Sequence, residues 1–288
     1  MLDVRAGQLN EELAGLDALE LADRSQVSLR RRAWTATWPK LAAVAMALAL
    51  WQVVVWSGWK PEYVLPGPGK VFGELRNQFA GGKLLPSIGL TMSRAARGYA
   101  LALVLGVVVG SVVARSKILR SAVGSFITGL QTMPSVAWFP LALLLFKLSE
   151  SAILFVVVLG AAPSIANGLI AGIDQIPPLH LRAGRVLGAK RWTMYRYVIT
   201  PAAFPGFVAG LKQGWGFAWR SLMAGELLVI IKGHQSVGVL MQNARDLSDT
   251  PALMAEMIVI LVIGIVVDAV VFAGIERTIR RRRGLLVT

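Results

Sequence analysis

Long hydrophobic stretches alternate with short polar segments along the whole chain. Residues 41–59, 121–146 and 151–173 contain no charged side chain, and each reaches the roughly 20 residues that an α-helix needs to cross a lipid bilayer. The pattern of apolar runs therefore predicts six transmembrane helices, at about residues 41–59, 87–114, 121–146, 151–173, 205–231 and 252–275.

The polar segments between these spans predict how the helices connect. Residues 60–86 hold a Pro-Gly-Pro-Gly run and predict one short helix near 71–79. The loop 174–204 is too polar to cross a membrane and too long for a turn, and it predicts two short helices that meet near Gly188. The fold class predicted is an all-α membrane protein, with an N-terminal extension (1–35) before a transmembrane domain (36–288).

The composition supports a membrane protein and excludes an ordinary soluble domain. Hydrophobic residues make up 55% of the chain and charged residues 16%, against about 25% charged in soluble domains. The net charge of +14 could indicate nucleic-acid binding, but the basic residues cluster near residues 30–40, 115–120, 182–196 and 277–283. Alternate loops lie on one side of the membrane, and the positive-inside rule places these loops and both termini in the cytoplasm. We therefore expect no nucleic-acid partner.

Residues for covalent or metal chemistry are scarce. The chain has no cysteine, and its two histidines, His180 and His234, fall in loops predicted on opposite sides of the membrane. Neither Gly69-Lys70 nor Gly82-Lys83 belongs to the Gly-x-x-x-x-Gly-Lys-Ser/Thr pattern that cradles nucleotide phosphates. We therefore expect no metal site, no catalytic residue and no bound cofactor, and any ATP hydrolysis must occur on another polypeptide.

The loop 174–204 carries a recognisable spacing of small residues. Ala183, Gly184 and Gly188, followed by Val198 and Pro201, resemble the cytoplasmic loop signature of binding-protein-dependent ABC importer permeases. The loop departs from that signature in three places, with Arg182 in place of glutamate, Gly184 in place of the second alanine and Thr200 in place of leucine.

Two further segments resemble one branch of this family. Residues 130–140 (LQTMPSVAWFP) and 160–168 (GAAPSIANG) are similar to the nitrate, sulfonate, taurine and bicarbonate permeases, and the aliphatic sulfonate permeases above all. The resemblance covers about residues 87–277. It implies the type I ABC importer permease fold, with six transmembrane helices and a cytoplasmic coupling helix in the loop 174–204.

The resemblance also implies partners and a coupling site. The chain would pair with a second permease copy and with two ATPase subunits that carry ATP and Mg²⁺, and it would receive substrate from an extracytoplasmic binding protein at the inner membrane. The coupling helix would seat in a groove of the ATPase. The residues implied in this contact are Arg182, Ala183, Gly184, Leu187, Gly188, Ala189, Trp192 and Pro201.

Polar and bulky residues inside the spans are candidates for the translocation path. Ionisable side chains are costly in hydrocarbon and mark functional hypotheses. Arg94, Arg97, Lys212 and Asp268 fall near span ends, where long side chains reach the interface, and prolines inside spans predict kinks. The candidate path residues are Met133, Pro134, Trp138, Trp215, Arg220 and Glu226. For the aromatic residues the alternative is core packing.

The substrate expected from the resemblance is a small anion, with an aliphatic sulfonate or taurine ahead of nitrate or bicarbonate. Two other classes remain as alternatives. A secondary transporter driven by an ion gradient would need matching broken helices in the two halves. A membrane-embedded enzyme would need clustered His, Asp or Glu side chains at the membrane face. The sequence contains neither pattern.

Overall fold

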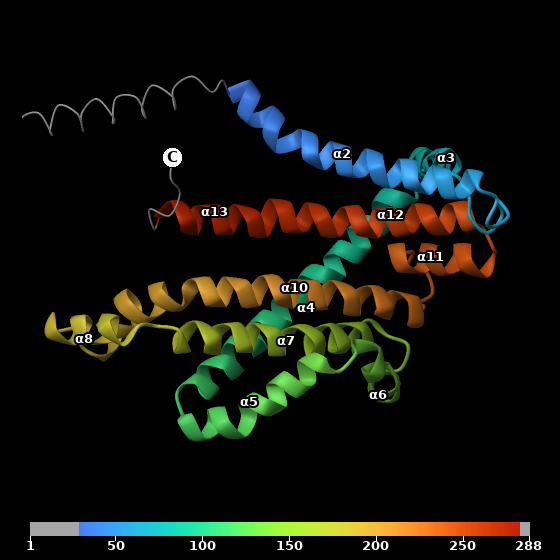
Figure 1. The fold of residues 1–288 in the computed structure, drawn as a ribbon. Helices are drawn as coiled ribbons and strands as arrows, with labels where there is room; N and C mark the ends of the chain where they lie inside the picture. The colour runs from blue at the N-terminus through green and yellow to red at the C-terminus, as the bar shows by residue number, and fades with distance from the viewer. Residues whose placement is uncertain (1–28, 283–288) are drawn as a thin grey trace, which may run out of the picture. The chain divides into compact units, whose positions relative to one another are not determined.

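A computed structural model describes residues 29–282 of the chain, and this part is helical, with no strand (Figure 1). The helices before the loop 174–204 are α2 (Leu29–Trp56), α3 (Pro68–Ala80), α4 (Leu84–Ala114), α5 (Lys117–Thr132), η1 (Ser135–Trp138), α6 (Phe139–Phe146) and α7 (Glu150–Asp174). Those after residue 174 are α8 (Pro178–Val186), α9 (Arg191–Met194), η2 (Tyr195–Ile199), α10 (Thr200–Leu228), α11 (Val237–Asp246), α12 (Thr250–Val267), η3 (Asp268–Phe272) and α13 (Ala273–Arg282).

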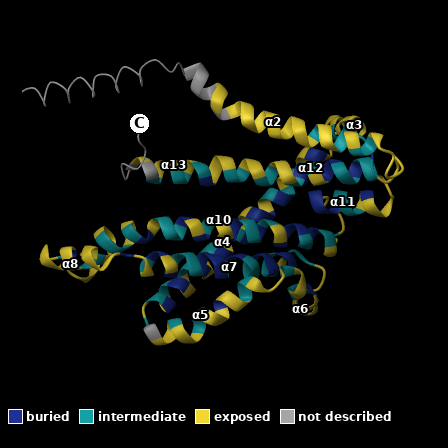
Figure 2. Cartoon of the chain, viewed as in Figure 1, coloured by how far each residue is buried: buried dark blue, intermediate teal, exposed yellow. Residues whose placement is uncertain are grey.

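The chain divides into two units, with Pro68 ending the first and Gly69 beginning the second. In the first unit, α2 is long and apolar enough to span a membrane from Thr37 to Trp56, and none of this stretch is buried (Figure 2). Trp51 Nε1 donates a hydrogen bond to the Pro66 carbonyl at 3.2 Å, which folds the following loop back on the end of α2. The residues of the predicted extension before Leu29 lie outside the described part.

Four helical stretches in the described residues meet the length and apolarity that a transmembrane helix requires, at Thr37–Trp56, Leu84–Ala114, Glu150–Asp174 and Thr250–Ile279. A fifth span is counted if the bent pair made by α5 and α6 crosses as one unit. Helix α10 is 29 residues long, but Lys212, Arg220 and Glu226 interrupt its apolar sequence, and it is not among these stretches. The count of six spans therefore stays a prediction.

The third predicted span, 121–146, is not one continuous helix. Helix α5 ends at Thr132, η1 and α6 follow, and the two parts are bent by 101°. Pro134 explains the break, because proline lacks a backbone N–H and disfavours helical geometry in the residue before it. Met133 is extended accordingly, with ψ at 126°. Pro163, in contrast, is accommodated inside the continuous helix α7.

Helix α7 forms the centre of the second unit and packs along both α4 and α10 (Figures 1 and 2). Glycines allow the close approach. A Cβ atom added to Gly210 would lie 2.5 Å from Gly168 Cα, and one added to Gly106 would lie 2.7 Å from Ile165 Cβ. Backbones this close are typical of small-residue interfaces between membrane helices. The buried apolar core therefore lies where α4, α7 and α10 meet.

Candidate functional site

The loop between α7 and α10 folds as the two short helices that its sequence predicts. Gly188 lies between them with φ at +76°, the left-handed geometry that glycine adopts most readily. The N–H of Gly188 donates to the Arg185 carbonyl at 3.0 Å, and the N–H of Ala189 donates to the Gly184 carbonyl at 2.9 Å. This pattern is a Schellman motif, which ends α8 and turns the chain toward α9.

Gly184 serves packing inside the loop instead of lying open to a partner. It is buried, and a Cβ atom there would lie 3.0 Å from Met194 Sδ and 3.1 Å from Val198 Cγ2. Its small size therefore lets α8 lie against α9 and η2. Ala183, in contrast, is exposed and is not packed inside the loop in this way.

The exposed surface of this loop carries both apolar and basic side chains. Leu187 is 85% exposed and Trp192 is 76% exposed, although side chains of this kind are normally buried. Arg182 and Arg185 lie beside them, also exposed, and neither forms an ion pair with any described residue. Uncovered apolar side chains rimmed by unpaired cations are typical of a protein interaction surface.

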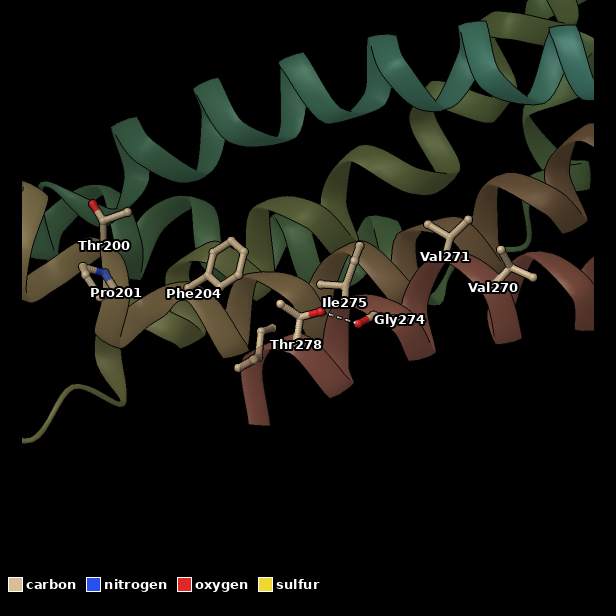
Figure 3. A pocket seen from close by; sticks show the side chains of 9 residues that line it. Thr200, Pro201, Phe204, Val270, Val271, Gly274, Ile275 and Thr278 are labelled. Carbon is tan, nitrogen blue, oxygen red and sulfur yellow. Dashed lines mark hydrogen bonds between the residues drawn. The ribbon is translucent and has the colours of Figure 1, made fainter. Parts of the chain in front are cut away.

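An apolar groove of about 840 Å³ opens just beyond the loop, where α10 begins (Figure 3). Its lining residues are Thr200, Pro201, Phe204, Val270, Val271, Gly274, Ile275, Thr278 and Ile279. The hydroxyl of Thr278 donates to the Gly274 carbonyl at 2.9 Å, so its proton is already used within the helix. Pro201, a residue of the predicted coupling site, lies on its wall and is exposed.

The predicted path residues separate into exposed and buried groups. Met133 and Pro134 are exposed at the break between α5 and η1, and Trp138 is half-buried. Trp215 is buried in the core, where its ring lies edge-on to Tyr99 at 5.5 Å and stacks with Trp219 at 6.0 Å. This placement agrees with the packing alternative for Trp215.

Glu226 is fully buried and takes part in a network of hydrogen bonds. Its Oε1 accepts from Arg94 Nη1 at 3.0 Å, and its Oε2 accepts from Thr91 Oγ1 at 2.9 Å. The backbone N–H of Gly238, in the first turn of α11, donates to Oε2 at 3.1 Å. A carboxylate at the N-terminus of a helix is favoured by the helix dipole. Glu226 therefore fixes α11 against α4 and α10 and faces no open surface in this structure.

Arg94 lies near the end of its span, so its side chain was expected to extend to the membrane–water interface. In the structure it is buried instead. The residue is 1% exposed, and its Nε donates to Glu150 Oε1 at 2.9 Å. Arg97, on the next turn of α4, reaches the other oxygen of Glu150 at 3.4 Å. Two carboxylates thus hold one buried guanidinium, and Arg94 is not available to bind an anion.

Lys212 and Asp268, both expected near the ends of their spans, are paired with each other in the structure. Lys212 Nζ lies 3.2 Å from Asp268 Oδ1 and 3.4 Å from Glu276 Oε1. These contacts join α10 to η3 and α13. They form at a point where the helix adopts π geometry, which often occurs at functional positions.

Arg220 differs from these residues because its charge has no acidic partner among the described residues. The side chain is exposed, its Nε donates to the Gly216 carbonyl at 3.0 Å, and its guanidinium lies 4.8 Å from the ring centre of Phe217. Such a contact is a cation–π interaction. Of the six predicted path residues, Arg220 is the one cation, and the structure leaves it open.

Sequence reasoning missed Thr91, Glu150 and Gly238 as members of the buried network. Arg94 lies 56 residues from Glu150 and 132 from Glu226 along the chain, so no local spacing reveals their contact. A charged residue in an apolar run is the only sequence signal that marks such a partner.

Comparison with known proteins identifies relatives over most of the chain. Residues 102–283 match the family model of the binding-protein-dependent transport system inner membrane component. A nitrate import permease protein of Synechococcus elongatus is 30% identical over 77% of this chain and 84% of its own length. A taurine transport system permease protein of Escherichia coli is 25% identical over 83% of this chain and 90% of its own.

A solved structure shares the fold. The crystal structure of an amino acid ABC transporter with histidines has a TM-score of 0.52 and 19% sequence identity to this chain, and the match covers 68% of this chain and 92% of that one. Together with the apolar helices and the family match over more than half of the residues, this likeness gives an all-α membrane protein of the ABC permease fold. The chain therefore belongs to the family of inner membrane components of binding-protein-dependent transport systems.

Proposed function

We propose that this ABC importer permease forms the translocation path for a small anion, with an aliphatic sulfonate or taurine as the preferred substrate. Import of nitrate or bicarbonate is the alternative within the same branch. Relatives named for taurine and for nitrate transport support a substrate with an oxyanion group, which is the sulfonate group in taurine. The preference for a sulfonate rests on family resemblance alone, and residues 130–140 and 160–168 carry the resemblance to the branch as a whole.

The observation that carries the proposed mechanism is the exposed surface of the loop between α7 and α10. This loop acts as the coupling helix and seats Leu187, Gly188 and Trp192 in a groove of a cytoplasmic ATPase subunit. Bulky apolar side chains supply most of the binding energy of such contacts. Arg182 and Arg185 face acidic side chains of the ATPase, which steers association more than it adds affinity.

The functional assembly contains two copies of this chain, two ATPase subunits that bind ATP and Mg²⁺, and an extracytoplasmic binding protein. ATP binding closes the ATPase dimer and draws the two coupling loops together. Since α10 follows the loop without interruption through η2, movement of the loop is carried into the helix that holds Arg220. The path then opens outward, and hydrolysis returns it inward.

A secondary transporter driven by an ion gradient is the alternative class of protein, and it would behave differently in transport experiments. In that case uptake would proceed without any ATPase subunit, and changes in the loop between α7 and α10 would leave it unchanged. The broken span α5–α6 is a feature that such transporters use, but they place it in both halves of the chain. The described residues contain one bent span, which favours the importer.

The test compares Leu187→Glu with a matched control, Leu247→Glu. Leu247 is 80% exposed at the end of α11, in a segment that the proposed topology puts on the other side of the membrane. The complex is reconstituted with its ATPase subunit, and ATPase activity stimulated by the binding protein and ethanesulfonate is measured. We expect Leu187→Glu to weaken subunit binding by about 2 kcal/mol or more, and Leu247→Glu to have little effect. Equal stimulation in both variants would contradict the proposed coupling site.

A further inference from the structure

Arg220 lies near the middle of the membrane-spanning part of the fold. Helices α7 and α10 run antiparallel, because Gly168 lies against Gly210 whereas Gly160 lies against Ser221. A Cβ atom on Gly160 would lie 2.5 Å from Ser221 Oγ, so residue 221 is level with residue 160. Since α7 runs from Glu150 to Asp174 and meets the criteria for a span, residue 160 lies close to its midpoint.

The side chain of Arg220 stays at that depth. Long basic side chains near span ends extend along the helix to reach water. Arg220 instead bends back to the carbonyl of Gly216 and rests on the ring of Phe217, one turn nearer the start of α10. Both contacts hold the guanidinium beside the middle of α7.

An exposed and unpaired guanidinium at this depth is costly if it faces lipid. The chain avoids this cost for Arg94 and Lys212, because each of these cations pairs with two carboxylates. Arg220 has no such pairing with a described residue, and the same exposed face of α10 presents Gln213, a second polar side chain. The face that holds Arg220 therefore fits a water-filled path.

A second polar feature lies at the same depth. Gln131, at the end of α5, donates to Ser164 Oγ at 2.8 Å and accepts from Asn167 Nδ2 at 2.6 Å, so the break after α5 is level with the middle of α7. Irregular backbone at membrane depth is tolerated only where it is buried in protein or lines an aqueous cavity. Met133 and Pro134 at this break are exposed.

We infer that the guanidinium of Arg220, held in place by Phe217 and the Gly216 carbonyl, is a mid-membrane binding site for a singly charged oxyanion on its way through the permease. The planar guanidinium offers parallel N–H donors that match two oxygens of a sulfonate, nitrate or bicarbonate group. This inference rests on the proposed function, and it makes Arg220 a residue that selects anions within the path. The binding protein then does not provide the only recognition step.

The test measures uptake by the complete importer in proteoliposomes, with ethanesulfonate, nitrate and bicarbonate offered separately. Arg220→Gln removes the charge, and Arg220→Lys keeps the charge but loses the paired donors. Arg245→Gln is the matched control, because Arg245 is also exposed and unpaired among the described residues but lies in the last turn of the short helix α11. Binding of labelled ethanesulfonate to the wild-type complex without binding protein gives a second readout.

We expect Arg220→Gln to reduce uptake of every anion that the wild type imports by about tenfold or more, while the ATPase still co-purifies with the variant. Arg220→Lys should retain an intermediate rate, and Arg245→Gln should match the wild type. Uptake by Arg220→Gln equal to the wild type, or no ethanesulfonate binding to a wild-type complex that imports it, would overturn the inference and leave the proposed function intact. A wild-type complex that imports none of the three anions would overturn both.

Discussion

The charged residues within the membrane-spanning helices differ in burial: some are buried and paired, and Arg220 is exposed. Arg94 and Glu226 are buried together, and every polar atom of the Glu226 carboxylate has a partner from Arg94, Thr91 or the backbone of Gly238. Arg220 is exposed, and its partners within residues 29–282 both belong to its own helix. The first arrangement stabilises the fold, whereas the second leaves a charge free for a ligand.

The buried pair gives a prediction for stability. Removing Arg94 leaves the buried Glu226 carboxylate uncompensated, so we expect Arg94→Gln to lower the free energy of unfolding by about 3–5 kcal/mol. Glu226→Gln should cost less, because Arg94 keeps its ion pair with Glu150. The measurement is thermal or denaturant unfolding of the purified chain in detergent. Arg97→Gln is the control, since its contact with Glu150 is 3.4 Å long and lies at the surface, where such pairs contribute about 0–1 kcal/mol. A loss in Arg97→Gln as large as that in Arg94→Gln would contradict this account.

At the scale of elements, the contact between α7 and α10 depends on glycine. Gly168 and Gly210 face each other so closely that an added Cβ atom on either would meet the opposite backbone. In the proposed mechanism, this contact keeps α10 in register with α7 while the loop moves. The packing of α10 on α7 is thus part of both the fold and the proposed mechanism.

Substitution at this contact should destabilise the protein. We expect Gly210→Ala to reduce the yield of folded protein and its melting temperature, because backbone must move to make room for the methyl group. Gly124→Ala in α5 is the matched control, as nothing lies within 4 Å of its added Cβ atom, and alanine is favoured over glycine inside helices by about 0.5–1 kcal/mol. Melting curves from intrinsic fluorescence in detergent distinguish the two. Equal curves would show that the close contact does not constrain the fold.

The sequence predicted the elements that depend on long apolar runs and missed those that depend on distant contacts. The run 151–173 became α7, because length and hydrophobicity determine such a span. The helix expected near 71–79 is α3, which was predicted from the proline and glycine residues around it. The break at Pro134 was visible only as an expected kink, since averaging over an apolar run hides one proline. Glu150 could not be assigned to Arg94, because nothing local links residues on different helices.

The candidate site was predictable to a similar extent. The turn at Gly188 follows from local sequence, and the exposure of Leu187 and Trp192 agrees with a loop that meets a partner. The internal role of Gly184 and the burial of Glu226 depend on packing that only the folded chain reveals. A second permease copy would cover some of the exposed residues. The sequence of one chain does not show which ones, because the contact forms only on assembly.

At the scale of the whole molecule, the absence of cysteine allows a direct test of membrane topology. We expect Leu187→Cys to react with a membrane-impermeant maleimide only after cells are opened, and Leu247→Cys to react in intact cells. Basic residues cluster near residue 187, and the positive-inside rule places that loop in the cytoplasm. Labelling of both positions from the same side would contradict the proposed arrangement.

The central claim is that this permease transmits force from a separate ATPase through the loop at Gly188. The most direct measurement is co-purification of the ATPase subunit with the tagged chain in mild detergent, comparing the wild type with Gly188→Trp and Gly82→Trp. Both glycines have positive φ and open space around them, at +76° and +69°, so backbone strain is matched and only the location differs. We expect the ATPase to bind the wild type and Gly82→Trp and to be lost from a folded Gly188→Trp variant. Equal recovery with all three, or with none, would contradict it.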